Sequence, residues 1–329
     1  MKRLAIIGGG AWGTALALVS RRAGGEPVLW ARDREIVAAI SERHENPIFL
    51  PGIALDPVIT ATADLAEATD AAQAAVLAVP AQFLRGVLAR LAGAMPAGLP
   101  VLICAKGIES GTGSTMSEIV AELLPGSPFA VLSGPSFAIE VAAGLPTAVT
   151  IASADKALAR ALSGALGSPR FRPYLSADPI GAEIGGAVKN VLAIACGIIH
   201  GRGLGDNARA ALITRGLAEM IRLGLAKGGR AETFSGLSGL GDLVLTCSAL
   251  KSRNHALGHA LGRGESLERA LAGRRSVVEG VASSAAIVAL AARLGVEMPI
   301  SEAVAAVIHE GVAIEAMTDR LLRRPYRSE

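Results

Sequence analysis

The sequence has few cysteines and few aromatic residues. Its 329 residues include only three cysteines, and Phe, Trp and Tyr together make up 3% of the chain. Cys104, Cys196 and Cys247 stand singly, with no CxxC pair and no Cys/His cluster, which argues against a disulfide framework and against a zinc site. We therefore expect reduced thiols, a cytoplasmic location and no bound metal. The bulk of any core must be Ala, Val, Leu and Ile.

An excess of one charge and long apolar runs are also missing. The 32 Lys and Arg residues nearly balance the 29 Asp and Glu residues, and no basic run is interleaved with aromatics, so we expect no nucleic-acid partner. No uncharged apolar run reaches about 18 residues, so we expect no membrane insertion. The basic and apolar N-terminus resembles a signal peptide, but three consecutive glycines favour a strand, a glycine turn and a helix instead.

The first half of the chain alternates short apolar runs with helical segments. Strands are predicted at 3–8, 27–31, 57–60, 74–80, 100–105, 129–134 and 146–153, with an edge strand at 170–175. Helices are predicted at 11–23, 33–43, 81–93, 114–124 and 155–167. This alternation predicts an α/β domain with a parallel, doubly wound sheet over residues 1–178.

The pattern changes after about residue 178. No convincing alternating strand follows, and long Ala/Leu/Val helices are predicted at 180–199, 207–227, 253–262, 266–272, 280–294 and 301–309. Glycine-rich stretches at 201–206 and 236–242 are interpreted as breaks between helices. The sequence therefore predicts a second, all-α domain over residues 179–329.

A glycine motif marks the start of the α/β domain. Gly8, Gly10 and Gly13 form GxGxxG directly after the first predicted strand and at the start of a helix. In that context the glycines allow a tight turn, a close approach to a pyrophosphate and close packing of helix on strand, so we predict dinucleotide binding. Arg32 at the end of the second strand favours NADP(H), with NAD(H) also possible. The neighbouring Asp33 is alternatively only a helix N-cap.

A lysine lies near the middle of the apolar helix predicted at 180–199. Gly185 and Gly186, about one turn from Lys189, weaken the helix and are interpreted as leaving open space around its ammonium. Such a lysine is typical of one that meets a ligand. The alternative is a lysine whose ammonium reaches the surface from a packed helix.

Two more groups of residues have the chemistry of an anion site. Lys106 follows one predicted strand, and Gly134 and Ser136 follow another, at the sheet edge where ligands bind in open α/β folds. From the helical half, Asp242 and the run Ser252–Arg253–Asn254 supply a carboxylate and an oxyanion clamp. The alternatives are a loop charge for Lys106 and helix-capping roles for Asp242 and Ser136.

Taken together, these motifs resemble one family. GGGAWGTALA, AKGIE, LSGPSFAIEV, GAEIGGAVKNVLAIACG, ALITRGLAEM, GLSGLGDLVLTC, SRN and VVEGV, in this order, resemble the bacterial NAD(P)-dependent glycerol-3-phosphate dehydrogenase family. The resemblance implies a Rossmann-type domain followed by a helical domain like that of 6-phosphogluconate dehydrogenase. It also implies reversible reduction of dihydroxyacetone phosphate to sn-glycerol 3-phosphate for glycerophospholipid synthesis, in a cytoplasmic homodimer.

The resemblance also assigns roles to residues. It implies that Lys189 is the catalytic lysine, the general acid in reduction and the base in oxidation, with Lys106 stabilising charge and Asp242 orienting Lys189. The implied substrate contacts are Lys106, Gly134, Ser136, Lys189, Asp242, Ser252, Arg253 and Asn254. The implied cofactor contacts are Ala11, Trp12, Arg32, Phe49, Lys106, Ala138, Arg253, Val277 and Glu279. Many relatives carry Ser at position 11, where Ala11 offers only its backbone.

Two other functions remain open from the sequence alone. One is a related two-domain dehydrogenase acting on a different hydroxy acid or ketone, for which the clamp at 252–254 set against Lys106 has no obvious use. The other is a non-catalytic NADP-sensing protein, which has no reason to keep Lys189 beside Asp242. A histidine general base is the weaker proposal, because His200, His255 and His259 have no carboxylate at a telling spacing.

Overall fold

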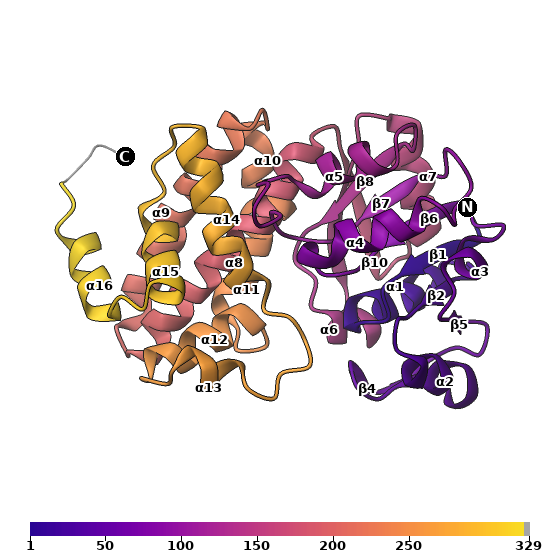
Figure 1. Cartoon of the computed structure of the whole chain (residues 1–329), viewed down its shortest axis with the longest axis horizontal. Coiled ribbons are helices and arrows are strands. Elements are labelled where there is room, and N and C mark those ends of the chain that lie inside the picture. Colours follow the sequence, from indigo (N-terminus) through magenta and orange to yellow (C-terminus); the bar gives the residue numbers. More distant parts are fainter. Residues whose placement is uncertain (326–329) are drawn as a thin grey trace.

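The chain forms an open sheet covered by helices on one side of the molecule and a group of helices on the other (Figure 1). The computed structural model describes residues 1–325. The eight strands of the main sheet are β1 (Leu4–Ile7), β2 (Val28–Trp30), β5 (Thr60–Thr62), β6 (Ala74–Leu77), β7 (Val101–Ile103), β8 (Phe129–Ser133), β9 (Thr147–Ala152) and β10 (Phe171–Ser176). Their order is β10-β9-β8-β7-β6-β1-β2-β5.

Helices cover both faces of this sheet. They are α1 (Ala11–Arg22), α2 (Arg34–Arg43), α3 (Leu65–Thr69), α4 (Ala81–Leu91), α5 (Met116–Leu123), α6 (Ala138–Ala142) and α7 (Lys156–Leu166). Alternate strand residues enter different cores: Leu4 and Ile6 join one buried cluster, and Ala5 and Ile7 join another. Both cores therefore confirm the doubly wound, Rossmann-type arrangement.

The sheet departs from the prediction in one pairing and several elements. Strand β9 runs antiparallel to β8, with Ser133 opposite Thr150, so the sheet is not wholly parallel. The connection between them, residues 134–146, holds the five-residue α6. The strand predicted at 57–60 lies at Thr60–Thr62. A hairpin of β3 (Glu45–Asn46) and β4 (Leu50–Ala54), and α3, were not predicted.

The rest of the described chain is helical. Its elements are α8 (Pro179–Gly201), α9 (Gly205–Ala226), α10 (Ala231–Ser235), η1 (Leu237–Gly241), α11 (Asp242–Ser248), α12 (Arg253–Gly262), α13 (Leu267–Leu271), α14 (Glu279–Arg293), α15 (Pro299–His309) and α16 (Ile314–Leu322). The interpretation of 236–242 as a break is wrong: most of it is the π-helical turn η1, which continues directly into α11. The boundary between β10 and α8 falls at residues 177–178, and the split into domains at that point stays a prediction.

Helix α8 runs through the centre of the helical part. It is long and apolar enough to cross a membrane, but 89% of an apolar 18-residue stretch of this helix is buried inside the protein. Four glycines bring it close to α12: a Cβ on Gly197 would lie 2.1 Å from the carbonyl oxygen of His255, and one on Gly258 would lie 2.0 Å from that of Ile194. Gly201 and Gly262 repeat the contact one turn on. The backbones therefore touch, which fixes α12 against the helix that carries Lys189.

Candidate active site

Two lysines share one buried carboxylate where the sheet meets the helices. The Lys189 ammonium donates to Oδ1 of Asp242 at 2.6 Å, and the Lys106 ammonium donates to Oδ2 at 2.8 Å. Lys189 and Asp242 are 8% and 1% exposed. Lys106 comes from the loop after β7, Lys189 from α8 and Asp242 from α11. The structure thus brings together all three residues predicted to be catalytic.

The local fold explains how Asp242 reaches this position. The π-helical turn η1 inserts its backbone against α8 and leads into α11, where Asp242 is already helical. It is therefore not the N-cap that was considered as an alternative. The Thr246 hydroxyl, one turn later, donates to the Asp242 carbonyl and accepts from Lys189 at 3.1 Å. Asp242 and Thr246 together hold the Lys189 ammonium from one side.

The glycines beside Lys189 do not leave open space. A Cβ on Gly185 would lie 2.4 Å from the carbonyl oxygen of Ser238 in η1. A Cβ on Gly186 would lie 3.3 Å from Cγ of Lys106 and 3.2 Å from Oγ of Ser133. The predicted space is wrong because η1 and the Lys106 side chain fill it. The glycines let the second lysine and the turn before Asp242 approach α8.

Burial and charge act in opposite directions in this cluster. Burial lowers the pKa of Lys189 to about 8, although the Asp242 carboxylate opposes the shift. Burial alone would raise the pKa of Asp242, but Lys106 and Lys189 outweigh it and the pKa lies below its ordinary value. Lys189 can therefore both give and accept a proton near neutral pH, which general acid–base chemistry requires.

The loop after β8 lies against Lys106. The Gly134 carbonyl accepts from the Lys106 ammonium at 3.1 Å and from the Ser136 hydroxyl at 3.0 Å. Gly134 has φ +126°, and a Cβ there would lie 3.1 Å from the Cα of Val149 in β9, so glycine is required. Ser136 does not cap α6, whose N-cap is Phe137.

The predicted anion clamp lies at the start of α12. Ser252 is the N-cap and accepts from the backbone N–H of His255, and Arg253 and Asn254 begin the helix. The free N–H groups of a helix N-terminus favour an anion, so the position suits a phosphate. The Asn254 side chain is engaged elsewhere: it donates to Oδ1 of Asn190 and accepts from the backbone N–H of Gly280. Asn190 in turn donates to the Lys106 carbonyl.

The glycine loop fits a dinucleotide. Gly8 has φ +131°, and a Cβ on Gly13 would lie 1.8 Å from the Gly8 carbonyl oxygen, so neither position accepts a side chain. Around Gly10, the N-cap of α1, there is open space and no side chain caps the helix. The first N–H groups of α1, at Ala11, Trp12 and Gly13, are therefore available to phosphate oxygens.

An apolar wall adjoins this loop. Ala11, Trp12, Phe49 and Ala138, all partly buried, pack against the same core cluster. Sequence reasoning missed the residue that places Phe49: Asn46 is fully buried, accepts from the Phe49 N–H, and donates to the Gly9 carbonyl and the Thr14 hydroxyl. An asparagine before a proline carries no sequence signal beyond that of a turn.

The remaining predicted cofactor residues lie on both the sheet part and the helical part of the molecule. Arg32 is exposed after β2, and Asp33 beside it caps α2, as its alternative interpretation predicted. Val277 precedes α14, and Glu279 begins it. One oxygen of Glu279 accepts from the Ala81 N–H at the start of α4, while Oε2 is buried without a partner in the described chain. Burial raises the pKa of Glu279 to about 7.

Three histidines form a separate cluster. Nδ1 of His200 lies 3.0 Å from Nε2 of His255, and the rings of His200 and His259 are in edge contact. His200 is 11 residues beyond Lys189 on α8, about 16 Å along the helix. Burial lowers the pKa of His255 to about 4. This cluster therefore offers no general base at the lysine site.

Comparison with known proteins identifies the family. The model of the NAD-dependent glycerol-3-phosphate dehydrogenase N-terminus matches residues 3–159, and that of its C-terminus matches residues 178–319. The chain belongs to the glycerol-3-phosphate dehydrogenase family. The family match confirms the predicted Rossmann-type and helical domains. It also confirms the prediction of an oxidoreductase that uses NAD(P)(H).

Relatives of this family match nearly the whole chain. Proteins named glycerol-3-phosphate dehydrogenase [NAD(P)+] from Rhodospirillum rubrum and Parvibaculum lavamentivorans are 59% and 57% identical, covering 99% and 100% of this chain and 93% and 98% of theirs. A crystal structure of glycerol-3-phosphate dehydrogenase from Coxiella burnetii is 40% identical with a TM-score of 0.95, covering 98% of this chain and 99% of that one.

Proposed function

We propose that this protein transfers hydride reversibly between NAD(P)H and dihydroxyacetone phosphate, giving sn-glycerol 3-phosphate for phospholipid synthesis. One observation carries the proposal: two lysines share the buried Asp242 carboxylate, and hydrogen bonds from Asn254 to Asn190 and from Asn190 to the Lys106 carbonyl tie the start of α12 to them. The cluster pairs a proton donor with an anion site, which a phosphorylated ketone needs. The relatives described above are named for the oxidation of glycerol 3-phosphate, the reverse of this reduction.

The chain's own residues supply the proton and the charge stabilisation. The nicotinamide cofactor, when bound, supplies the hydride. Lys189, held by Asp242 and Thr246, protonates the carbonyl oxygen in reduction and accepts the proton back in oxidation. Lys106 stabilises the negative charge that develops on that oxygen. No metal ion is part of this proposal.

The phosphate is held on the helical side of the site. Arg253 at the start of α12 supplies a guanidinium, and the backbone N–H groups of the helix N-terminus add donors. Asn254 contributes by position: its bonds to Asn190 and Gly280 tie α12 to α8 and α14. Its side chain thus supports the clamp while its backbone lies at the helix start.

A spectrophotometric assay at 340 nm with dihydroxyacetone phosphate tests the proposal. We expect Lys189→Ala to lose at least 1,000-fold in kcat, about 4 kcal/mol of transition-state stabilisation, with cofactor binding intact. Lys156→Ala, which removes an exposed lysine at the start of α7, is the matched control and should retain full activity. Wild-type protein without turnover would refute the substrate; an active Lys189→Ala would refute the role of the lysine.

The position of Arg32 supports a preference for NADP(H). The residue is exposed directly beyond β2, where a 2′-phosphate would meet its guanidinium. We expect Arg32→Ala to raise KM for NADPH about tenfold and to leave KM for NADH within twofold. Equal changes for both cofactors would contradict the preference.

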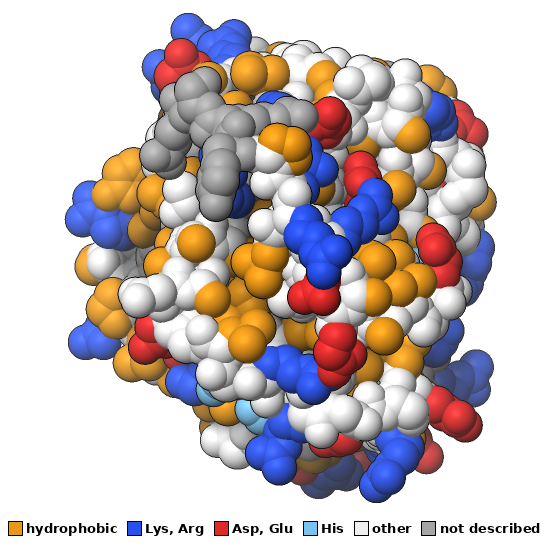
Figure 2. All heavy atoms as spheres, turned by 90° about the vertical axis from the view of Figure 1, so that its left-hand side faces the viewer, with side chains coloured by type: hydrophobic (Ala, Val, Ile, Leu, Met, Phe, Trp, Pro, Cys, Tyr) orange, Lys and Arg blue, Asp and Glu red, His pale blue; other side chains and the backbone are white. Residues whose placement is uncertain are grey.

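We also propose a homodimer in the cytoplasm. Figure 2 shows hydrophobic side chains gathered among charges of both signs on the end of the helical part, without a wide field of one charge on that face. Leu204 and Leu225, at the two ends of α9, are each 49% exposed. The three cysteines are unpaired and buried, in keeping with a reducing compartment. Sedimentation equilibrium at micromolar concentration tests the dimer.

A further inference from the structure

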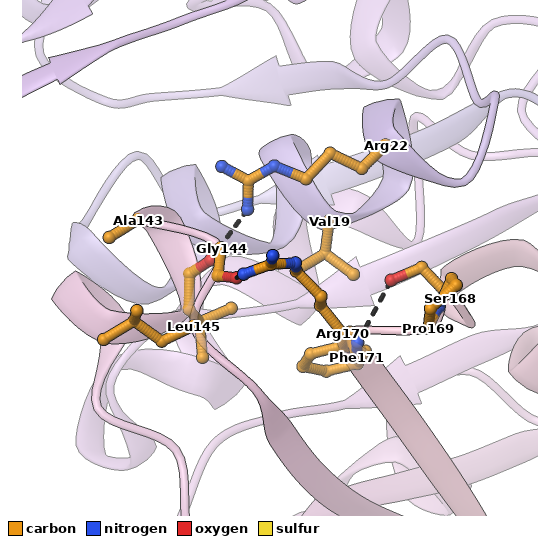
Figure 3. Close-up of a pocket in the computed structure, with 10 residues that line it drawn as sticks. Val19, Arg22, Ala143, Gly144, Leu145, Ser168, Pro169, Arg170 and Phe171 are labelled. Atoms are coloured by element: carbon orange, nitrogen blue, oxygen red, sulfur yellow. Dashed lines mark hydrogen bonds between the residues drawn. The ribbon is translucent and has the colours of Figure 1, made fainter.

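A cavity of about 410 Å³ lies on the sheet side of the molecule, apart from the lysine cluster (Figure 3). Its walls come from the last turns of α1 and α6, the loop that leads into β9, and the turn that leads into β10. The volume is within the range of small-molecule sites in proteins. None of the residues assigned to the cofactor or the substrate lines it.

The floor of this cavity is apolar and fixed. Val19, Val141 and Phe171 are 3%, 2% and 4% exposed and belong to one core cluster of the sheet. Leu145 also lines the cavity and is 48% exposed. An apolar group of a ligand would therefore find both a rigid floor and a leucine side chain that could cover it.

Two guanidinium groups stand over this floor. Arg22 donates to the Val141 and Ala142 carbonyls at the end of α6, and Arg170 donates to the Gly144 carbonyl at 3.3 Å. Both side chains turn toward the loop at 143–145 in Figure 3. Each guanidinium has five N–H donors, so donors remain after these bonds.

The positive charge of the cavity is not balanced. None of the lining residues is acidic, and neither arginine forms an ion pair within the described residues 1–325. Burial lowers the pKa of Arg22, and no carboxylate offsets that shift. Because guanidinium forks match carboxylate and phosphate oxygens, an oxyanion is the complement of this pair.

We propose that this cavity binds a small organic anion, with its carboxylate or phosphate on Arg22 and Arg170 and its apolar chain on Val19, Val141 and Phe171. The proposal is independent of the proposed function. The two arginine side chains favour a negatively charged head group. The apolar floor favours anions that also carry an apolar chain over those that do not.

Titration calorimetry on the full chain, saturated with NADPH, tests the proposal with defined probes. Hexanoate and hexyl phosphate carry the two head groups, hexanamide lacks the charge, and acetate lacks the chain. We expect at least one six-carbon anion to bind at least tenfold tighter than hexanamide and acetate. The stronger of the two identifies the head group. Equal affinity of hexanamide and both anions would overturn the proposal.

Two variants and a matched control locate the binding. Arg170→Ala removes an exposed guanidinium and one long hydrogen bond, and Leu145→Glu adds a negative charge on the rim; each should weaken binding of the preferred anion at least fivefold. Arg172→Ala removes a nearby exposed arginine that does not line the cavity and should change affinity less than twofold. Equal weakening by Arg170→Ala and Arg172→Ala would overturn the proposal.

Discussion

Asp242 decides the electrostatics of the lysine cluster. Its two oxygens serve two different lysines, so the buried group carries one net positive charge. Ionising both lysines in a buried place is unfavourable unless anions are near. The carboxylate offsets one charge, and the substrate phosphate or the developing oxyanion offsets the other. The site is therefore most stable electrostatically when substrate is bound.

The pKa of Lys189 predicts opposite pH profiles for the two reaction directions. Lys189 is protonated below about pH 8 and neutral above it. Reduction needs the protonated form, so kcat/KM for dihydroxyacetone phosphate should fall as pH rises through about 8. Oxidation needs the neutral form, so kcat/KM for sn-glycerol 3-phosphate should rise through the same range. Initial rates from pH 6 to 10 in both directions measure this.

Asp242→Asn provides the control for this assignment. Removing the carboxylate removes the attraction that favours protonated Lys189, so the midpoint of both profiles should move to lower pH. An unchanged midpoint would assign the titration to another group.

At the scale of elements, the contact between α8 and α12 positions the phosphate clamp. The helices meet through Gly197, Gly201, Gly258 and Gly262, where a Cβ would overlap the facing backbone. The start of α12 therefore has one position relative to Lys189. The glycines therefore help to position the site, although they lie further along α8 and α12 than Lys189 and the clamp residues.

Gly258→Ala should lower both stability and activity. The added Cβ would lie 2.0 Å from the Ile194 carbonyl oxygen, and such overpacking costs about 1–3 kcal/mol of unfolding free energy. KM for dihydroxyacetone phosphate should rise because α12 moves.

The matched control is Gly86→Ala in α4, where nothing lies within 4 Å of an added Cβ. The control should gain up to about 1 kcal/mol from helix propensity. Urea denaturation and steady-state kinetics distinguish these outcomes, and equal stability changes would contradict the close contact.

Helices and strands with regular periodicity could be predicted, and irregular ones could not. Seven of the eight predicted strands overlap the observed strands closely, because buried runs such as 74–80 are continuous and apolar. The π-helical turn at Leu237–Gly241 could not be distinguished from a break, since glycine content alone marks no helix. Strand β9 was predicted at 146–153, but its antiparallel direction was not, because strand direction depends on the path of the connection through α6 rather than on the composition of the strand.

At the scale of the whole molecule, two carboxylates join the halves through helix N-termini. Glu183 of α8 accepts from the Ser117 N–H and hydroxyl in the first turn of α5, and Glu279 of α14 accepts from the N–H of Ala81 in α4. Both acids come from the helical part and both partners from the sheet part. Each buried carboxyl group accepts a backbone N–H from the first turn of a helix in the other part, a group with no partner inside its own helix, so these contacts hold the two parts together.

The Glu183 contact predicts a pH-dependent stability. Burial raises the pKa of Glu183 from 4.5 to about 7, so the folded state binds its proton more tightly than the unfolded state does. Its contribution to stability is fully present below pH 4.5 and is lost as pH rises toward 7. Each tenfold difference in proton affinity between the two states corresponds to about 1.4 kcal/mol.

The variant Glu183→Gln tests this prediction. It keeps an acceptor for the Ser117 N–H and should reduce the loss of stability between pH 4.5 and 7. Urea denaturation at pH 5 and 7.5 measures it; an equal slope in both proteins would refute it.

The composition of the site was more predictable from sequence than its internal bonding. The strand ends placed Lys106 at the crevice, and the family resemblance added Lys189 and Asp242. The hydrogen bonds among the three depend on η1, which leads into Asp242. Asn254 was predicted to bind substrate, and its bonds to Asn190 and Gly280 appear only in three dimensions. Asn46 was missed because its partners, Gly9 and Thr14, are distant in the chain.

The Lys106–Asp242 ion pair crosses between the two halves, and this makes docking of the halves a requirement for the chemistry. The helical half alone holds Lys189 with Asp242, a neutral pair, whereas the sheet half alone exposes a solitary lysine. A phosphorylated ketone binds where there is an excess positive charge beside the proton donor Lys189. Neither half has that excess charge by itself. Separating the halves would therefore remove Lys106 from the site. The net charge at Lys189 and Asp242 would fall from +1 to zero, and the site would no longer attract an anion.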